Sequence, residues 1–343
     1  MSNNVKKRIF YFDELRALAI VMVILCHIAV LYKPFGYSSL KACIPSFIYI
    51  VTHVAVPIFF MLSGALLLNR QHELKEFFKK RFSRILYPFI FWVIVAVLAT
   101  LFLLGGDSTE VFKILLGKDR WTWFVWVMIG IYLILPVINS FVKDYGLKGC
   151  EYFLAIWLIT MILQTFHKYP FYRLELSYFA GYVGYLILGY YLANKQFNIS
   201  DKKMMVMGLI LFVGFTLINW IVVSEGIKNV ETKYLSVFTV FASIGLFLFF
   251  RYYDNFCKLN PKNFLSKIHQ KVENGKAGAV IFSLSACSYG MYLTNSLLTK
   301  FIPKPVTSVK MYPVYFIAVL LISWLLVKLV SKIPKLDKFS GAA

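Results

Sequence analysis

Arg16 and His27 lie eleven residues apart in the first apolar segment of the chain, IFYFDELRALAIVMVILCHIAVLY. Ionisable groups inside a membrane helix are costly, and they usually face a cavity in which they act. Eleven residues make about three turns of α-helix, so the two side chains share one face, about 16 Å apart along the axis. This spacing predicts a fixed cation near one membrane surface and a titratable imidazole near the other, as in an active site that crosses the bilayer.

The composition of the chain is that of a polytopic helical membrane protein. Hydrophobic residues are 59% of the chain and charged residues only 15%, which is outside the usual balance of soluble proteins. Apolar runs of about twenty residues recur along the sequence, each long enough to cross a bilayer. The first run has no small-residue cleavage site, so we expect it to remain as a helix and not to be removed as a signal peptide. The predicted fold class is therefore all-α.

Hydropathy and length predict about ten transmembrane helices, with ends placed to within a few residues. The predicted spans are 9–32, 44–68, 85–104, 122–142, 150–167, 174–193, 204–223, 233–250, 279–299 and 311–330. An even number places both termini on one side of the membrane. That side carries roughly twice as many Lys and Arg residues as the other, which predicts that the N- and C-termini are cytoplasmic. We therefore expect a multi-pass protein of the cell membrane, with one embedded domain (1–335) and a C-terminal tail (336–343).

The net charge of +21 raises the question of a nucleic-acid partner. The basic residues are spread over membrane-flanking loops, however, and no soluble domain remains that could read a groove, so we expect no nucleic acid to bind. Topology signals and attraction to anionic membrane lipids explain most of these charges. A few could instead meet a polyanionic cosubstrate that approaches from the cytoplasm.

Several common site patterns do not occur in the sequence. The five cysteines form no CxxC pair, and we expect no metal site. The phosphate-binding patterns GxGxxG and GxxxxGK[ST] do not occur either, which argues against nucleotide hydrolysis.

Two further sets of side chains are candidates for a site. Arg81 and Arg84 are i, i+3 neighbours before the third span, where they either bind phosphate bidentately or anchor the helix at the inner interface. Tyr289, Tyr292 and Asn295 lie at spacings of three on one face of the ninth span. A polar stripe inside lipid favours a cavity wall, although tyrosines that simply pack between helices are common.

The outer half of the second span carries His53, at a depth close to that of His27. His53 could be a partner base, a substrate contact or a core residue, and we favour the last two roles. Pro57 frees a backbone carbonyl in the same helix and could open a cavity there. Trp123 belongs to a predicted aromatic belt at the outer interface and is a candidate substrate contact.

Two stretches outside the apolar cores of the spans, 72–85 and 251–278, are expected to form short surface helices. In the second stretch, Leu265, Ile268 and Val272 fall on one helical face. Three histidines lie in predicted loops and are expected to be solvated: His72, His167 and His269.

Five pieces of the chain form an ordered set of motifs. They are FDELRALAIVMVILCH (12–27), VAVPIFFMLSGALLL (54–68), FFKKRFSRILYPFIFW (77–92), WTWFVWVMIGIYLILPVI (121–138) and SACSYGMYLTN (285–295). Together they resemble the acyltransferase-3 family of integral-membrane acyltransferases, over nearly the whole chain. One position departs from the family pattern, because the histidine that usually ends the motif S-Y-x-x-Y-L-x-H is Asn295 here. Asparagine can orient a substrate but cannot accept a proton at neutral pH.

The resemblance implies a single-domain O-acyltransferase in the membrane. The family moves acetyl or other short acyl groups, generally from acyl-CoA, onto sugars of surface glycans, glycolipids or antibiotics. Acetyl-CoA or another acyl-CoA is then the expected cosubstrate, bound by Arg16, Arg81 and Arg84, and no metal is needed. A cell-surface glycan or glycolipid is the expected acceptor. The candidate contacts to it are His53, Trp123, Tyr289, Tyr292 and Asn295.

His27 has the chemistry that such a transfer needs. Its imidazole could remove the proton of a sugar hydroxyl, or could take the acyl group itself and pass it on; the alternative is a buried imidazole satisfied by a neighbouring helix. Arg16 either extends to the inner interface or pairs with Asp13, which lies one turn away. Asp13 would then complete the catalytic set as an orienting residue. An extended pantetheine arm is on the order of the estimated distance between Arg16 and His27, so we expect the two residues to mark its course.

The rival prediction is a transporter or exporter of polysaccharide or lipid-linked glycan that performs no acyl transfer. Ten spans with polar residues near the midplane would suit such a protein. The chain shows no matching halves, however, and segments broken by Gly or Pro do not recur at paired positions. The identity of the acceptor, the acyl length and the oligomeric state are left open by the sequence.

Overall fold

The computed structural model describes residues 8–31, 40–71, 73–103, 105, 109, 122–167, 175–302 and 310–342. The described residues form helices and no strand. The helices are α1 (Phe10–Leu31), α2 (Leu40–Val51), α3 (Ala55–Leu67), α4 (Leu74–Phe102), α6 (Trp123–Thr165), α7 (Val183–Asn194), α8 (Asp201–Ser224), α9 (Val237–Leu259), α10 (Phe264–Asn274), α11 (Lys276–Leu298), α12 (Met311–Lys332) and α13 (Asp337–Ser340). Short 3₁₀ turns occur at Thr52–Val54 (η1), Ser177–Phe179 (η2) and Thr299–Phe301 (η3).

Within the described ranges, eight helices are long and apolar enough to cross a membrane. They are α1, the stretch Cys43–Leu67, α4, α6, α8, α9, the stretch Lys276–Phe301 and α12. The prediction of an all-α polytopic membrane protein is thereby confirmed. The number differs from the ten predicted spans because 122–142 and 150–167 both lie in α6, whereas 174–193 contains only the 12-residue helix α7.

A single glycine bends α6 between its two apolar halves. Gly146 has φ 58° and ψ −146°, a conformation that is not helical and that glycine reaches because it has no Cβ atom. The bend separates residues 123–145 from residues 147–165. These two segments correspond to the fourth and fifth spans predicted from hydropathy.

The expected surface helix at 72–85 does not exist as a separate element. Residues from Leu74 onward form the beginning of α4, which runs without interruption to Phe102 over 29 residues. No glycine or proline lies between Leu74 and Tyr87, so nothing ends the basic segment before the apolar one begins. His72 lies outside the described residues.

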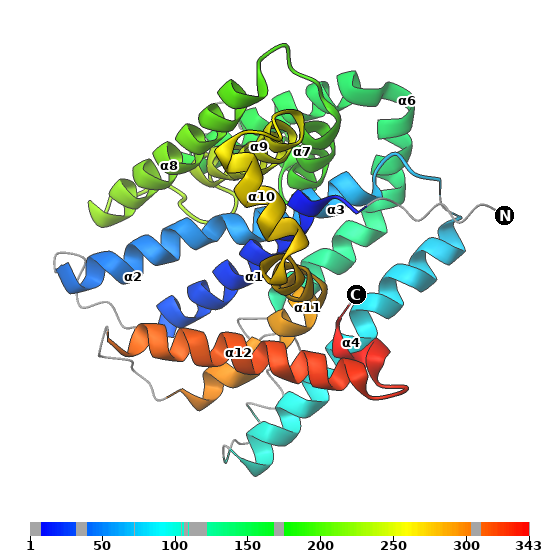
Figure 1. Cartoon of the computed structure of the whole chain (residues 1–343), viewed down its shortest axis with the longest axis vertical. Coiled ribbons are helices and arrows are strands. Elements are labelled where there is room, and N and C mark those ends of the chain that lie inside the picture. The colour runs from blue at the N-terminus through cyan, green and yellow to red at the C-terminus, as the bar shows by residue number, and fades with distance from the viewer. Residues whose placement is uncertain are drawn as a thin grey trace.

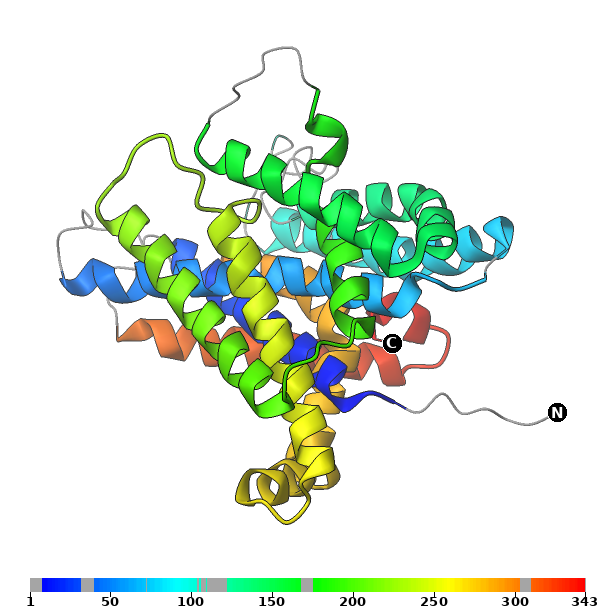
Figure 2. The same cartoon turned by 90° about the horizontal axis from the view of Figure 1, so that it is seen from above.

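Helix α1 occupies the interior of the bundle, where it packs against α3, α9, α11 and α12 (Figure 1). Ile20, Ile24 and Ile28 are spaced by four and are buried, so they form one continuous apolar row along the helix. Helix α12 runs along the edge of the bundle in both views (Figures 1 and 2). Its outward row is apolar and exposed: Val314, Ile317, Leu321, Leu325 and Leu329. An exposed apolar row on a helix of this length is the surface that a lipid bilayer covers.

Helices α3 and α7 approach each other backbone to backbone. A Cβ atom added to Gly189 would lie 2.0 Å from the carbonyl oxygen of Met61, and one added to Gly64 would lie 1.7 Å from the carbonyl oxygen of Leu186. Small residues at a helix contact are a common means of close packing inside membranes. This contact holds α3, and with it Phe59 and Val56, in place beside α1.

Helix α10 projects from the body of the bundle at the end of α9 (Figure 2). Its predicted apolar face is turned outward, since Leu265 is 40% exposed and Ile268 is 43% exposed. Ser266 and His269 on the other face are buried. The short helix predicted within 251–278 is therefore present as α10, and its polar face meets the protein.

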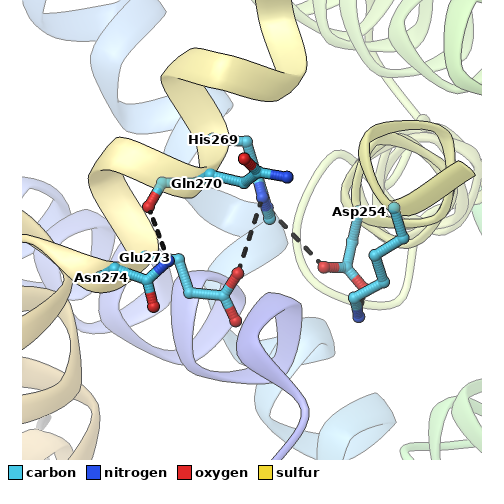
Figure 3. A network of polar contacts seen from close by, with 6 residues as sticks. Asp254, His269, Gln270, Glu273 and Asn274 are labelled. Atoms are coloured by element: carbon cyan, nitrogen blue, oxygen red, sulfur yellow. Dashed lines mark hydrogen bonds and ion pairs between the residues drawn. The ribbon is translucent and has the colours of Figure 1, made fainter. Parts of the chain in front are cut away.

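The prediction that His269 is solvated is wrong, because α10 packs this ring against α9. Nε2 of His269 lies 3.7 Å from Oδ1 of Asp254, and Nδ1 lies 3.9 Å from Oε2 of Glu273 (Figure 3). The rings of Phe10 and Tyr253 meet it edge to face, with centroids at 5.6 and 5.1 Å. His167 is exposed at the end of α6, as predicted.

Candidate active site

A cavity of about 1140 Å³ lies between the first half of α1, the basic beginning of α4 and the end of α12. Its wall carries seven basic side chains: Arg16, Arg70, Arg81, Arg84, Lys328, Lys332 and Lys338. Asp337 is the one acidic residue among the described residues that line it. We call this space the basic cavity. A concave wall that carries cations with little acidic compensation raises the local concentration of anions.

The three arginines assigned to cosubstrate binding meet in the basic cavity. Arg81 and Arg84 stand one turn apart on α4, and Arg16 reaches the same space from α1. The buried phenol of Tyr132 on α6 lies within electrostatic reach of all three guanidinium groups. Because arginine holds phosphate through two parallel hydrogen bonds, this arrangement can bind a molecule that carries several phosphates.

A second, much smaller cavity surrounds His27. Its volume is about 20 Å³, which is room for roughly one water-sized group. The polar and aromatic side chains in its wall are Cys26, His27, Thr52, Phe59, Trp123, Phe124, Tyr234 and Tyr292. We call this space the His27 cavity.

The ring of His27 is held by Asn295, from the opposite side of the α1–α11 contact. Nδ1 of His27 is hydrogen-bonded to Oδ1 of Asn295. The amide nitrogen of Asn295 donates to the carbonyl oxygens of Met291 at 2.9 Å and of Tyr292 at 2.7 Å. An amide whose NH₂ group is used in this way presents its oxygen as acceptor, so Nδ1 of His27 carries the proton. Nε2 is then the basic nitrogen of the ring.

Three aromatic side chains form the wall that the two cavities share. Phe59 of α3, Phe124 of α6 and Tyr292 of α11 line both spaces. The ring centroids of Phe59 and Phe124 are 6.0 Å apart, and those of Phe124 and Tyr292 are 5.2 Å apart. We call these three residues the aromatic septum. Arg16 and His27, which the spacing placed on one helical face, lie on opposite sides of it.

Asp13 is bonded to groups other than Arg16. Its carboxylate accepts hydrogen bonds from Arg8 and, at 2.6 Å, from the hydroxyl of Ser285. Ser285 belongs to the wall of the basic cavity, and the guanidinium of Arg8 also lies over the ring of Phe282, 3.1 Å from its centroid. Asp13 therefore ties α1 to α11 behind the cavity wall.

His53 lies beside the His27 cavity without lining it. Its Nδ1 donates to the carbonyl oxygen of Tyr49 at 2.5 Å, and its ring packs at a tilt of 37° against that of Tyr234, with centroids 4.8 Å apart. Tyr234 also packs against Trp123, and the centroids of these two rings are 5.2 Å apart. Since His53 is 1% exposed, it supports Tyr234 and does not face the cavity directly.

Tyr289 has a place of its own in the site. Its hydroxyl donates to the carbonyl oxygen of Ile85 at 2.9 Å, which joins α11 to the start of the apolar part of α4. The three residues of the predicted polar stripe on α11 thus lie in three different environments. Tyr289 lines the basic cavity, Tyr292 belongs to the septum, and Asn295 holds His27.

The segment after α12, which was expected to be a tail, packs into the wall of the basic cavity. Nε1 of Trp92 donates to the carbonyl oxygen of Ser340 at 3.1 Å. The backbone N–H of Gly290 donates to the carbonyl oxygen of Gly341 at 3.2 Å. Ser340 is completely buried. Residues 340–342 therefore form part of the site and link α4 to α11.

Several residues of the two cavities were not found by sequence reasoning. Four basic residues have the sequence pattern of interface anchors: Lys328, Lys332, Lys338 and Arg70. No local pattern separates a basic residue at a membrane surface from one in a cavity wall. Other residues that were missed are Thr52, Phe59, Phe124, Tyr132 and Tyr234, which are apolar or weakly polar side chains in apolar surroundings. Among the described residues there is no group of three or more His, Cys, Asp or Glu side chains that could hold a metal ion.

Comparison with protein families gives one match, which covers residues 9–328. The matching family is described as an acyltransferase domain. Comparisons with curated proteins and with solved structures gave no significant match. The match runs from the start of α1 into α12. It includes the residues of the His27 cavity and of the septum, whereas the basic-cavity residues from Ser331 onward lie beyond it.

Proposed function

Because the chain belongs to the acyltransferase-3 family of integral-membrane acyltransferases, we propose that it transfers an acetyl or other short acyl group from acyl-CoA to a hydroxyl of a cell-surface glycan or glycolipid. The observation that carries this proposal is the position of His27. Its ring lies in a small cavity that three aromatic side chains separate from a large basic one.

The basic cavity supports an acyl-CoA as the donor. A coenzyme with several phosphates needs fixed cations, and Arg16, Arg81 and Arg84 converge in a space of about 1140 Å³. The coenzyme would keep its phosphates at these arginines while its flexible arm carries the thioester toward the septum. In this arrangement the charged part of the donor never has to enter the apolar interior, where unpaired charge is costly.

His27 supplies the acid–base chemistry in the proposed reaction. Nε2 accepts the proton of the acceptor hydroxyl while the hydroxyl oxygen attacks the carbonyl carbon of the thioester. A C–O bond forms, the C–S bond breaks, and the leaving thiolate takes the proton from His27, so CoA departs as the free thiol. In a two-step version Nε2 attacks the carbonyl itself, and the hydroxyl then cleaves the acyl-imidazole.

The acceptor is proposed to enter from the side of Trp123 and Tyr234. These aromatic residues line the His27 cavity, and their rings pack against each other at a tilt of 33° with a centroid distance of 5.2 Å. Aromatic faces combined with the hydroxyls of Thr52 and Tyr234 suit the mixed apolar and polar surface of a sugar ring. His53 would keep Tyr234 in position from behind.

The direct test is a turnover assay with purified protein in detergent. Labelled acetyl-CoA is supplied with and without glycan acceptors, and both thioester loss and acetylated product are followed. We expect activity that His27→Ala abolishes and that the control His167→Ala, an exposed histidine outside both cavities, leaves intact. Absence of thioester cleavage that depends on His27 would favour a transporter, and label retained on quenched protein without acceptor would favour the two-step route.

A further inference from the structure

The His27 cavity is far smaller than the basic cavity that would feed it. The two volumes are about 20 and about 1140 Å³. A water-sized group needs roughly 10–15 Å³ of such space, so the smaller cavity accepts a methyl-sized group and little more. Whatever passes from one space to the other must therefore end in a very short apolar group.

Aliphatic side chains on two helices form part of the wall of the His27 cavity. Val23 lies one turn before His27 on α1, and Val56 faces it from α3, beside Ala55. All three are buried, at 5%, 7% and 1% exposure. Neither valine is in the wall of the basic cavity. They limit space only beside the imidazole, where the carbonyl of a bound thioester would have to lie.

The surrounding packing keeps this wall rigid. Helix α3 is held against α7 through the backbone contacts of Gly64 and Gly189, so Val56 cannot move back without shifting two helices. Interiors that are packed in this way respond to an added methylene with a marked loss of binding.

We infer that Val23 and Val56, together with the aromatic septum, restrict the group transferred by this protein to acetyl. The inference rests on the proposed function, because it concerns the acyl group that reaches His27. The septum admits the thioester arm between Phe59, Phe124 and Tyr292, and the two valines set how many carbons fit beyond the carbonyl. A butyryl group carries two methylenes more than acetyl, and each methylene that a pocket cannot hold reduces turnover about 10- to 200-fold.

The experiment compares acetyl-, propionyl-, butyryl- and hexanoyl-CoA as donors, with thioester loss as the readout. The wild-type protein should prefer acetyl to butyryl by about 100-fold or more. Val56→Ala, and separately Val23→Ala, should reduce this preference to about 10-fold, because each removes two methyl groups from the wall. Val54→Ala is the matched control: this valine is equally buried on the neighbouring turn η1 and lines neither cavity, so the preference should not change.

Val56→Ile provides the opposite change by filling the cavity. It should lower acetyl turnover about tenfold or more while the affinity for CoA, which depends on the basic cavity, stays the same. Two variants at separate positions keep the test valid if one of them fails to fold, as judged by gel filtration in detergent. Equal wild-type turnover of acetyl and butyryl, or a shift in Val54→Ala as large as in Val56→Ala, would overturn the inference. No turnover of acetyl-CoA by the wild-type protein would instead reject the proposed function.

Discussion

Asn295 and His27 are 268 residues apart in the chain, and their side chains are hydrogen-bonded to each other in the buried interior. The amide of Asn295 is oriented by two backbone carbonyls of its own helix, so it cannot turn over without losing both hydrogen bonds. It thereby fixes the tautomer of His27 that has a basic Nε2. This position usually holds a histidine in the family that the chain resembles, and here the asparagine can orient the ring of His27 without titrating itself.

Replacing Asn295 by Leu should therefore reduce turnover more than donor binding. Without the acceptor for Nδ1–H, the ring can turn or change tautomer, and we expect kcat to fall on the order of 100-fold. The KM for acetyl-CoA should change little, because the basic cavity is not altered. Steady-state kinetics of thioester cleavage measure both quantities.

Asn295→His serves as the companion to that variant. A histidine also offers a ring nitrogen that can accept from Nδ1 of His27, so we expect it to retain more activity than the leucine variant. If both variants were as active as the wild type, Asn295 would have no positioning role.

Arg84→Ala should weaken acyl-CoA binding and leave acceptor binding nearly unchanged. The guanidinium of Arg84 lines the basic cavity beside Arg81, and losing one bidentate phosphate contact should raise the KM for acetyl-CoA about tenfold or more. Arg84→Lys should recover only part of this loss, since an ammonium is a point charge. Lys202→Ala is the charge-matched control, because Lys202 is exposed on α8 and lines neither cavity. Equal effects on both substrates would contradict the assignment.

Gly189→Ala should destabilise the protein through the α3–α7 contact. The new Cβ would lie 2.0 Å from the carbonyl oxygen of Met61, so the helices must separate, with an expected loss of about 1–3 kcal/mol. The measurement is the midpoint of thermal unfolding in detergent. Gly130→Ala on α6 is the control, since no atom lies within 4 Å of its added Cβ. Alanine is the better helix former by about 0.5–1 kcal/mol, so this control should raise the midpoint slightly while Gly189→Ala lowers it.

His269→Ala should destabilise the contact of α10 with the bundle. The substitution removes a ring that is 3% exposed and packed edge to face against Phe10 and Tyr253, beside the carboxylate of Asp254. Truncating a buried aromatic side chain to alanine typically lowers the free energy of unfolding by about 2–4 kcal/mol. His167→Ala, at an exposed histidine, should stay within about 0.5 kcal/mol of the wild type. The measurement is again the midpoint of thermal unfolding in detergent. Equal midpoints for the two variants would show that the packing of His269 contributes nothing to stability.

Sequence reasoning recovered what depends on local spacing. Apolar length predicted the helical membrane fold. The i, i+3 spacing of Arg81 and Arg84 placed them side by side on one helix, and both line the basic cavity. The face shared by Arg16 and His27 also indicated the site, but not that the aromatic septum divides it. The septum is built from α3, α6 and α11, and no pattern along one helix specifies how three helices bring their rings together.

The prediction failed where burial depends on what surrounds a helix. His269 was expected to be solvated in a loop, but it lies on α10 and is buried, whereas Leu265 and Ile268 on the other face of this helix are exposed. At a membrane, lipid can cover an apolar face, so the polar face is free to meet charged partners such as Asp254. For a similar reason, the sequence did not determine which groups bind the carboxylate of Asp13. Arg16 is its neighbour along α1, but Arg8 and Ser285 reach its carboxylate from other directions.

The aromatic septum also has an electrical consequence. A basic cavity that reached the outer side without interruption would be a pore for small anions, and a membrane protein with such an opening would discharge the ion gradients of its cell. Phe59, Phe124 and Tyr292 stand between the two cavities, and apolar constrictions exclude hydrated ions by dewetting. In the proposed reaction, the same three rings that would admit a thioester arm would therefore keep the bilayer insulated between turnovers.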